Sequence, residues 1–166
     1  EGGRGGADFV EENGPLMGHL ELARPILDGP GESSSDMAEE FWPGALTLIL
    51  FKGPSVSPAV TAGKDTVAVR VPNYPLALKL IEATGAPLTG TSANRFGESD
   101  PVTAGEVRQQ LGEEVDVILD EGACPLKGGS TIVDVTLDTP LVVRDGVIPT
   151  SILTKVCPGI GMAVQA

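Results

Sequence analysis

The chain has 166 residues, of which 41% are hydrophobic and only 4% aromatic, and its formal net charge is -12. This length and composition fit one globular domain with a mainly aliphatic core, and they exclude general disorder. The acidic excess argues against direct binding of an RNA or DNA backbone over a broad surface, although a few arginines can still form a local anion site.

Composition divides the chain at about residue 36. Residues 1–36 contain eight acidic and two basic residues, start with EGGRGG and end with DGPGESSSD. Because such stretches are typical of loops, we expect 1–36 to be an irregular or linker-like segment. One or two helical turns are possible over 19–27, before Pro25 interferes. Residues 37–166 are expected to form an α/β domain.

The regular pattern starts at residue 37. Its first half predicts the end of a helix before Pro43, strands over 45–51 and 66–71, a helix over 75–84 and a short extended segment over 87–89. The run ALTLILF at 45–51 is apolar almost throughout, which is typical of a strand that is buried on both faces.

The second half carries the clearest helix signal. Thr103 and Glu106 form a capping box, and Val102 and Val107 occupy the staple positions around it, so a helix is expected over 103–111. After this helix, the pattern predicts strands over 115–119, 131–135 and 141–144 and a short helix over 152–156. Strands interleaved with helices predict an α/β fold with one twisted mixed β-sheet flanked by helices.

Several common sites are absent from the sequence. Residues 62–65 do not complete a P-loop, Gly159 and Gly161 do not complete a dinucleotide fingerprint, and the single histidine, His19, argues against a serine hydrolase. No cluster of cysteine and histidine has zinc spacing, and we predict no protein metal site. The sequence contains neither a membrane-length apolar run nor a signal peptide, so we expect two reduced thiols and a cytoplasmic location without membrane contact.

Two arginines stand at the ends of predicted strands. Arg70 lies in an apolar strand, where it needs either a structural ion pair or an anionic ligand such as a carboxylate or phosphate. Arg144 also needs a partner, and its neighbour Asp145 points to the opposite side of the strand. Thr66, four residues before Arg70, either faces the same region or is an ordinary strand residue.

Two loops combine small hydroxyl residues with glycine. Thr91, Ser92 and Asn94 belong to the T-S-A-N sequence, and Ser130 and Thr131 follow two glycines. Such loops let the backbone approach a ligand closely, although each sequence taken alone is also compatible with an ordinary turn.

The order of these motifs is more specific than any one of them. Between about residues 37 and 148, five motifs follow one another: FWPGALTLIL, VAVRVPN, TGTSAN, GGSTIVDV and VVRDGVI. In this order they resemble the YrdC-like family of threonylcarbamoyl-AMP synthases. The resemblance implies a twisted mixed sheet around a concave nucleotide site. It also implies a nucleotidyltransferase that condenses L-threonine, bicarbonate and ATP to threonylcarbamoyl-AMP and pyrophosphate.

The resemblance further implies that ATP is a substrate accompanied by Mg²⁺, and that downstream proteins transfer the threonylcarbamoyl group to an adenosine of tRNA. By matched position, it assigns catalytic roles to Arg70 and Arg144. L-Threonine would be bound by Arg70, Thr91, Ser130 and Thr131, and ATP by Thr66, Ser92, Asn94 and Arg144.

The chain departs from the family pattern in two respects. The family's N-terminal P-T-[DE]-T-x-Y-G-L and K-x-R motifs are not found in residues 1–40, and Phe96 replaces a serine after the T-S-A-N sequence. We therefore expect an N-terminally truncated or diverged form with weak or absent synthase activity. The alternatives are an inactive nucleotide- or RNA-binding module of the same fold and a carbamoyl-adenylate-forming domain.

Overall fold

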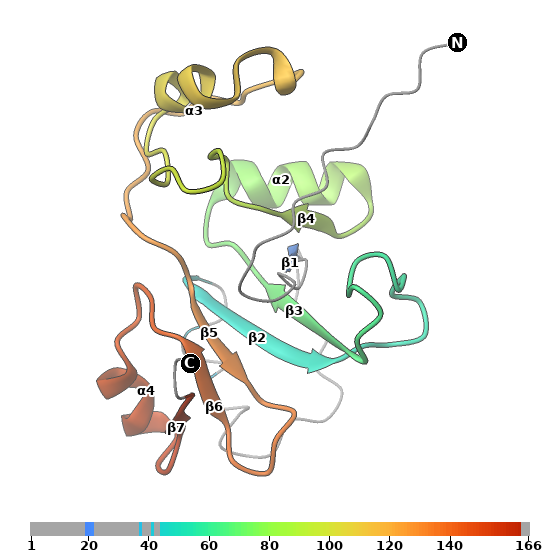
Figure 1. Cartoon of the computed structure of the whole chain (residues 1–166), viewed down its shortest axis with the longest axis vertical. Coiled ribbons are helices and arrows are strands. Elements are labelled where there is room, and N and C mark those ends of the chain that lie inside the picture. The colour runs from blue at the N-terminus through green and yellow to red at the C-terminus, as the bar shows by residue number, and fades with distance from the viewer. Residues whose placement is uncertain (1–18, 22–36, 38–40, 42–43, 164–166) are drawn as a thin grey trace.

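The computed structural model describes residues 19–21, 37, 41 and 44–163 (Figure 1). Its centre is a seven-stranded mixed sheet with the order β4-β1-β3-β2-β5-β6-β7. The strands are β1 (His19–Glu21), β2 (Leu46–Phe51), β3 (Thr66–Arg70), β4 (Leu88–Gly90), β5 (Thr131–Asp134), β6 (Leu141–Arg144) and β7 (Gly161–Met162). This architecture confirms the predicted fold class.

Strand β2 lies at the centre of the sheet because its side chains are apolar on both faces. It pairs antiparallel with β3 and parallel with β5, and its first four residues are buried. Around it, the core consists of aliphatic side chains from the neighbouring strands and from α4, with almost no aromatic contribution. The fully buried side chains include Leu46, Leu48, Val71, Val133, Val142 and Leu153.

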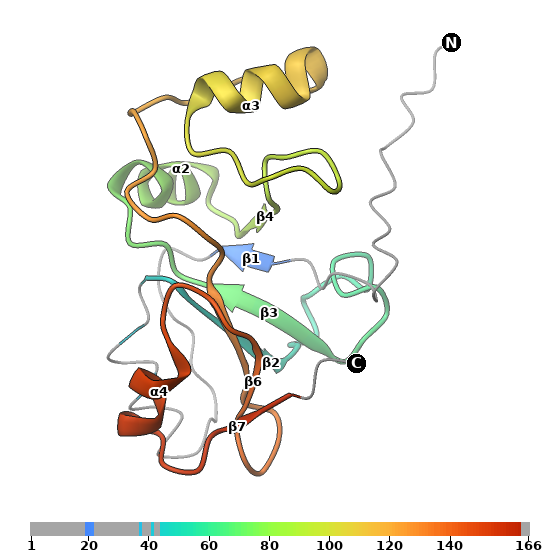
Figure 2. The same ribbon diagram turned by 60° about the vertical axis from the view of Figure 1, so that its left-hand side comes forward.

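The helices have the boundaries that their capping residues dictate. Helix α2 (Pro75–Thr84) starts with proline and ends at Gly85, whose φ of 65° is the left-handed conformation that glycine adopts easily. Helix α3 (Ala104–Leu111) is capped by Thr103, and the 3-10 helix η1 (Gly112–Glu114) follows it. Helix α4 (Thr150–Val156) lies beside β6 and β7, at the other end of the molecule from α3 (Figure 2).

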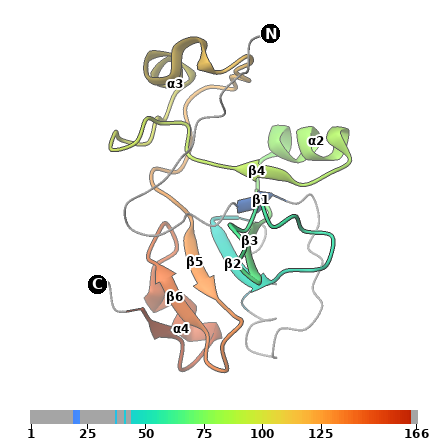
Figure 3. The same ribbon diagram turned by 45° about the vertical axis from the view of Figure 1, so that its right-hand side comes forward.

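The predicted cap of α3 is confirmed with one variation. The Thr103 hydroxyl accepts a hydrogen bond from the Glu106 backbone N–H at 3.2 Å. The Glu106 carboxylate accepts from the Val102 N–H at 2.6 Å, one residue before the expected donor. This cap is important because α3 contains no buried residue and stands away from the sheet (Figure 3). Local hydrogen bonds therefore contribute more to this helix than packing does.

Three local predictions differ from the structure. Residues 115–119 form no strand, since the apolar alternation is present but no neighbouring strand supplies ladder hydrogen bonds. His19–Glu21 forms β1, between β3 and β4, where the sequence indicates an irregular segment or helical turns. The two-residue strand β7 was not predicted. The rest of residues 1–36 lies outside the described ranges.

Both cysteines carry free thiols, in different surroundings. Cys157 is 1% exposed and belongs to the core, and burial raises the pKa of its thiol, whereas Cys124 is exposed. Within the described ranges, no helix combines the length and apolar character that crossing a bilayer requires.

We expect a disulfide reagent such as Ellman's reagent to modify one thiol rapidly at pH 8, because only an accessible thiolate reacts. Cys157 should react only after urea unfolding, and Cys124→Ser should abolish the rapid phase. Rapid reaction of both thiols in the folded protein would contradict the burial of Cys157.

Candidate functional site

The topology brings four strand ends together at one end of the sheet. Strands β2 and β5 are parallel and start there, while β3 and β6, which are antiparallel to them, end there. Arg70 is the last residue of β3, Arg144 is the last residue of β6, and Ser130 directly precedes β5. The motifs that carry Arg70, Ser130 and Arg144 are far apart in sequence but adjacent in the fold.

A cavity of about 480 Å³ opens at this end of the sheet. Its floor includes Gly44, Arg70 and Ser130 from the strand ends, and one wall is formed by the start of α2. The opposite wall is the irregular segment 119–126, which includes the exposed apolar side chains Leu119 and Leu126. The volume suits a small molecule, and one arginine in an otherwise largely apolar lining suits a ligand with one carboxylate.

Ser130 lies at the centre of a hydrogen-bond network at the cavity floor. Arg144 donates to the Ser130 carbonyl from Nε at 3.1 Å and from Nη2 at 2.8 Å. Nη2 also lies 3.2 Å from the Ser130 hydroxyl. The same hydroxyl is 2.6 Å from the hydroxyl of Thr47 on β2. Arg144 therefore fixes Ser130, whereas Arg70 and Ser130 line the cavity itself.

The local structure explains why glycine occupies the first two positions of the G-G-S-T motif. Gly128 has a φ of 104°, which favours glycine. A Cβ on Gly129 would lie 2.9 Å from Nη2 of Arg144, so the guanidinium occupies the space that a side chain would need. The motif thus permits the close approach of Arg144 to Ser130.

Thr131, which the family resemblance assigns to L-threonine binding, does not line the cavity. It is fully buried, and its hydroxyl donates to the Ile148 carbonyl at 2.7 Å and accepts from the Ile148 N–H at 3.0 Å. Because both functions of the hydroxyl are used and Thr131 does not line the cavity, it ties β5 to the segment after β6.

Tyr74 and Glu121 both line the cavity. Hydrogen bonding to Glu121, with smaller contributions from burial and nearby negative charges, raises the pKa of Tyr74. The Glu121 carboxylate therefore favours the neutral phenol.

The remaining predicted ATP residues lie towards the other end of the sheet. Thr66 starts β3, so about 13 Å of extended chain separates it from Arg70. Gly90, which precedes the T-S-A-N sequence, is level with His19 and thereby with Ala68 of β3. Thr91 and Ser92 are exposed, and neither they nor Thr66 and Asn94 line the cavity.

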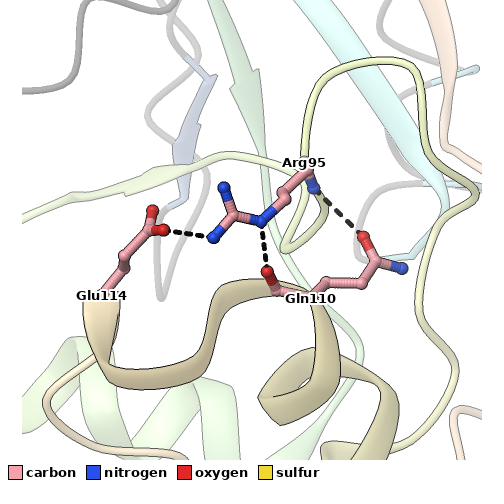
Figure 4. Close-up of polar contacts among 3 residues, drawn as sticks. All are labelled: Arg95, Gln110 and Glu114. Carbon is pink, nitrogen blue, oxygen red and sulfur yellow. Dashed lines mark hydrogen bonds and ion pairs between the residues drawn. The ribbon is translucent and has the colours of Figure 1, made fainter.

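The T-S-A-N loop is held from both sides by hydrogen bonds. The Asn94 amide donates to the Glu98 carbonyl at 2.8 Å, while its buried Oδ1 accepts no hydrogen bond from the described residues. Arg95 pairs with Glu114, its Nε donates to the Gln110 carbonyl, and its backbone N–H donates to the Gln110 side chain (Figure 4). Arg95 thus connects the loop to α3 and η1.

Arg95→Ala is expected to loosen this loop without unfolding the sheet, because both side-chain contacts of Arg95, to the Gln110 carbonyl and to Glu114, are lost and none in the core is. The backbone N–H of residue 95 still donates to the Gln110 side chain. Limited proteolysis should cut residues 91–99 several-fold faster, with an unfolding midpoint close to the wild-type value. Arg108→Ala, an exposed arginine on the same helix, is the matched control. Equal cleavage rates for the two variants would exclude this role for Arg95.

The structure brings Arg70, Ser130 and Arg144 together and leaves Thr66, Thr91, Ser92 and Asn94 elsewhere. Two contributors were missed by sequence reasoning: the hydroxyl of Thr47 and the wall at 119–126. The signal for Thr47 was present, since it is the only polar residue in the run ALTLILF. The wall had been interpreted partly as a strand.

Comparison with known proteins places this geometry in a family. The profile of the Sua5–YciO–YrdC family, described as "Telomere recombination", matches residues 16–146. The chain belongs to the Sua5–YciO–YrdC family. The match begins well before residue 37, where the motifs alone placed the start, and it therefore includes strand β1.

Relatives in this family are named as synthases. A putative threonylcarbamoyl-AMP synthase of Mycobacterium tuberculosis is 36% identical over 143 residues, covering 86% of this chain and 65% of that protein. The threonylcarbamoyl-AMP synthase of Bacillus subtilis is 40% identical over 136 residues, covering 80% of this chain and 39% of that protein. The chain thus spans less than two thirds of the length of these curated relatives.

Solved structures of the family share the fold. The crystal structure of Pyrococcus abyssi Sua5 complexed with L-threonine has a TM-score of 0.82 at 33% identity, covering 87% of this chain and 44% of that one. Escherichia coli YciO has a TM-score of 0.71 at 27% identity, covering 86% of this chain and 71% of that one. These similarities confirm the YrdC-like architecture around the cavity.

Proposed function

We propose that this chain binds L-threonine in the cavity between Arg70 and Ser130 and acts as a threonylcarbamoyl-AMP synthase domain. The observation that carries the proposal is that Arg70 and Ser130 line the same cavity, whose volume is about 480 Å³. A guanidinium fork matches a carboxylate, and the serine hydroxyl supplies a further donor. The relatives named threonylcarbamoyl-AMP synthase and the L-threonine complex of Pyrococcus abyssi Sua5 support the same ligand.

In the proposed reaction, the threonine amine attacks the carbon of bicarbonate; a C–N bond forms, a C–O bond breaks, and water leaves, which gives a carbamate. A carbamate oxygen then attacks the α-phosphorus of ATP, a P–O bond forms, and pyrophosphate leaves. The reaction needs no protein nucleophile, so the residues contribute orientation and charge stabilisation. Arg70 would hold the carboxylate of L-threonine. Arg144 would act through Ser130 as a positioning residue, and it would be catalytic only if it also contacts a phosphate of ATP.

ATP would extend from this cavity towards the T-S-A-N loop, where Thr91, Ser92 and Asn94 offer small polar groups. The buried Oδ1 of Asn94 accepts no hydrogen bond within the described part of the chain, which supports a hydrogen-bond donor from a ligand bound at that loop. The described residues contain no group of three or more histidine, cysteine or carboxylate side chains that could hold a metal. Mg²⁺ that accompanies ATP would be held in large part by the ATP phosphates, which commonly bind this ion.

The product would be consumed by proteins that transfer the threonylcarbamoyl group to tRNA, and the reaction would take place in the cytoplasm. The net charge of -12 supports a division of labour in which this chain makes the adenylate and does not itself grip the RNA.

The test is release of pyrophosphate from ATP by the purified chain, with L-threonine and bicarbonate present or each omitted. Release that needs both co-substrates supports the synthase. ATP binding without turnover in a folded protein would instead identify an inactive nucleotide-binding module. Turnover with carbamoyl phosphate in place of L-threonine and bicarbonate would identify a carbamoyl-adenylate-forming domain.

A further inference from the structure

The hydrogen atoms in the Ser130 network can be assigned from burial. Thr47 is 0% exposed, and the Ser130 hydroxyl, 2.6 Å away, is the only hydrogen-bond partner of its side chain among the described residues. If Ser130 were the donor, the Thr47 proton would be buried without an acceptor, which is costly. Thr47 must therefore donate to Ser130.

This assignment fixes the remaining geometry at Ser130. Its hydroxyl oxygen accepts from Thr47 and, at 3.2 Å, from Nη2 of Arg144, so both of its lone pairs are used. Its own proton must point in another direction. Because Ser130 lines the cavity and is 7% exposed, the cavity is where that proton can find an acceptor.

We propose that Thr47 is a positioning residue that turns the Ser130 hydroxyl into a directed hydrogen-bond donor for the ligand's carboxylate. Thr47 pairs with Arg70 across β2 and β3, so the two side chains share one face of the sheet, and the Thr47 hydroxyl lies 2.6 Å from the hydroxyl of Ser130. The identity of the ligand rests on the proposed function, but the direction of the hydrogen bond does not.

The hydrogen bond is tested without ligand, by urea unfolding of the wild type, Thr47→Val, Ser130→Ala and the double variant. Thr47→Val should lower the unfolding midpoint in the wild-type background. In the Ser130→Ala background it should leave the midpoint unchanged or raise it, because it removes a buried donor that has lost its acceptor. Equal lowering in both backgrounds would overturn the proposal, whatever the ligand is.

The positioning role is tested by calorimetric titration with L-threonine. Thr47→Val should weaken binding about three- to ten-fold, which is the effect of one neutral hydrogen bond, and Thr47→Ser should restore it. Thr61→Val is the matched control, since Thr61 is equally buried but its hydroxyl donates to the Lys64 carbonyl at 2.9 Å, away from the cavity. It should lower stability without changing the affinity.

The two experiments separate the two claims. If the wild type binds L-threonine and Thr47→Val binds it with the same affinity, the positioning role is overturned and the proposed function stays intact. Failure of the folded wild type to bind L-threonine would overturn the proposed function, and the unfolding series would still decide whether Thr47 and Ser130 are hydrogen-bonded.

Discussion

Gly146→Ala is expected to lower the free energy of unfolding by about 3 kcal/mol, at the upper end of the usual cost of overpacking. A Cβ at this position would lie 2.6 Å from the Gly129 carbonyl oxygen, the Ser130 carbonyl carbon and the Thr131 nitrogen. All three are backbone atoms, so no side-chain rotation can relieve the contact, and the start of β5 must move. Urea unfolding measures the effect.

Gly53→Ala is the matched control, because a Cβ there would meet no atom within 4 Å. It should be neutral or slightly stabilising, since alanine restricts the unfolded chain more than glycine does. If Gly146→Ala were as stable as Gly53→Ala, the close packing of the segment after β6 against Ser130 would be wrong. The displaced Ser130 should also weaken L-threonine binding by Gly146→Ala at temperatures where that variant is folded.

Arg70→Ala is expected to weaken L-threonine binding at least ten-fold, since a hydrogen bond to a charged group contributes about 1.5–3 kcal/mol. Arg70 lines the cavity and is the last residue of β3, a strand whose three central residues are buried. Arg70→Lys should recover only part of the affinity, because an ammonium group cannot form the two-pronged contact of a guanidinium.

Calorimetric titration measures these affinities, and the exposed Arg108→Ala controls for the loss of one positive charge. An Arg70→Ala variant that is folded and binds L-threonine like the wild type would show that the role of Arg70 is structural. That alternative was already open at the level of the sequence, where an arginine in an apolar strand fits both a structural ion pair and an anion site.

The fold could be predicted where local chemistry and tertiary structure agree. Three elements have a clear local pattern: the apolar run of β2, the alternating valines of β3 and the capping box of α3. All three lie within one residue of the expected boundaries. The prediction failed at 115–119, because alternation indicates a strand only if a neighbouring strand offers ladder hydrogen bonds. It failed at β1 because three residues are too few to give a pattern.

The site could be predicted only in part, for a related reason. Residue type and strand position singled out Arg70 and Arg144, and the resemblance to the YrdC-like family assigned roles to them and to Ser130. The strand directions bring all three to one end of the sheet. The distinction between a residue that lines the cavity and one that supports it depends on burial and hydrogen bonding, which the sequence does not contain. Thr131 and Ser130 are neighbours with similar side chains, yet only Ser130 reaches the cavity.

The central claim is that the cavity at the ends of β3 and β6 is the L-threonine site. Amide chemical shifts of the ¹⁵N-labelled chain during an L-threonine titration test it most directly. We expect saturable shifts at Gly44, Arg70 and Ser130, with the amides of Lys79 and Lys155 unmoved. Saturable shifts confined to residues 91–99, or no shift in a well-dispersed spectrum, would contradict the claim.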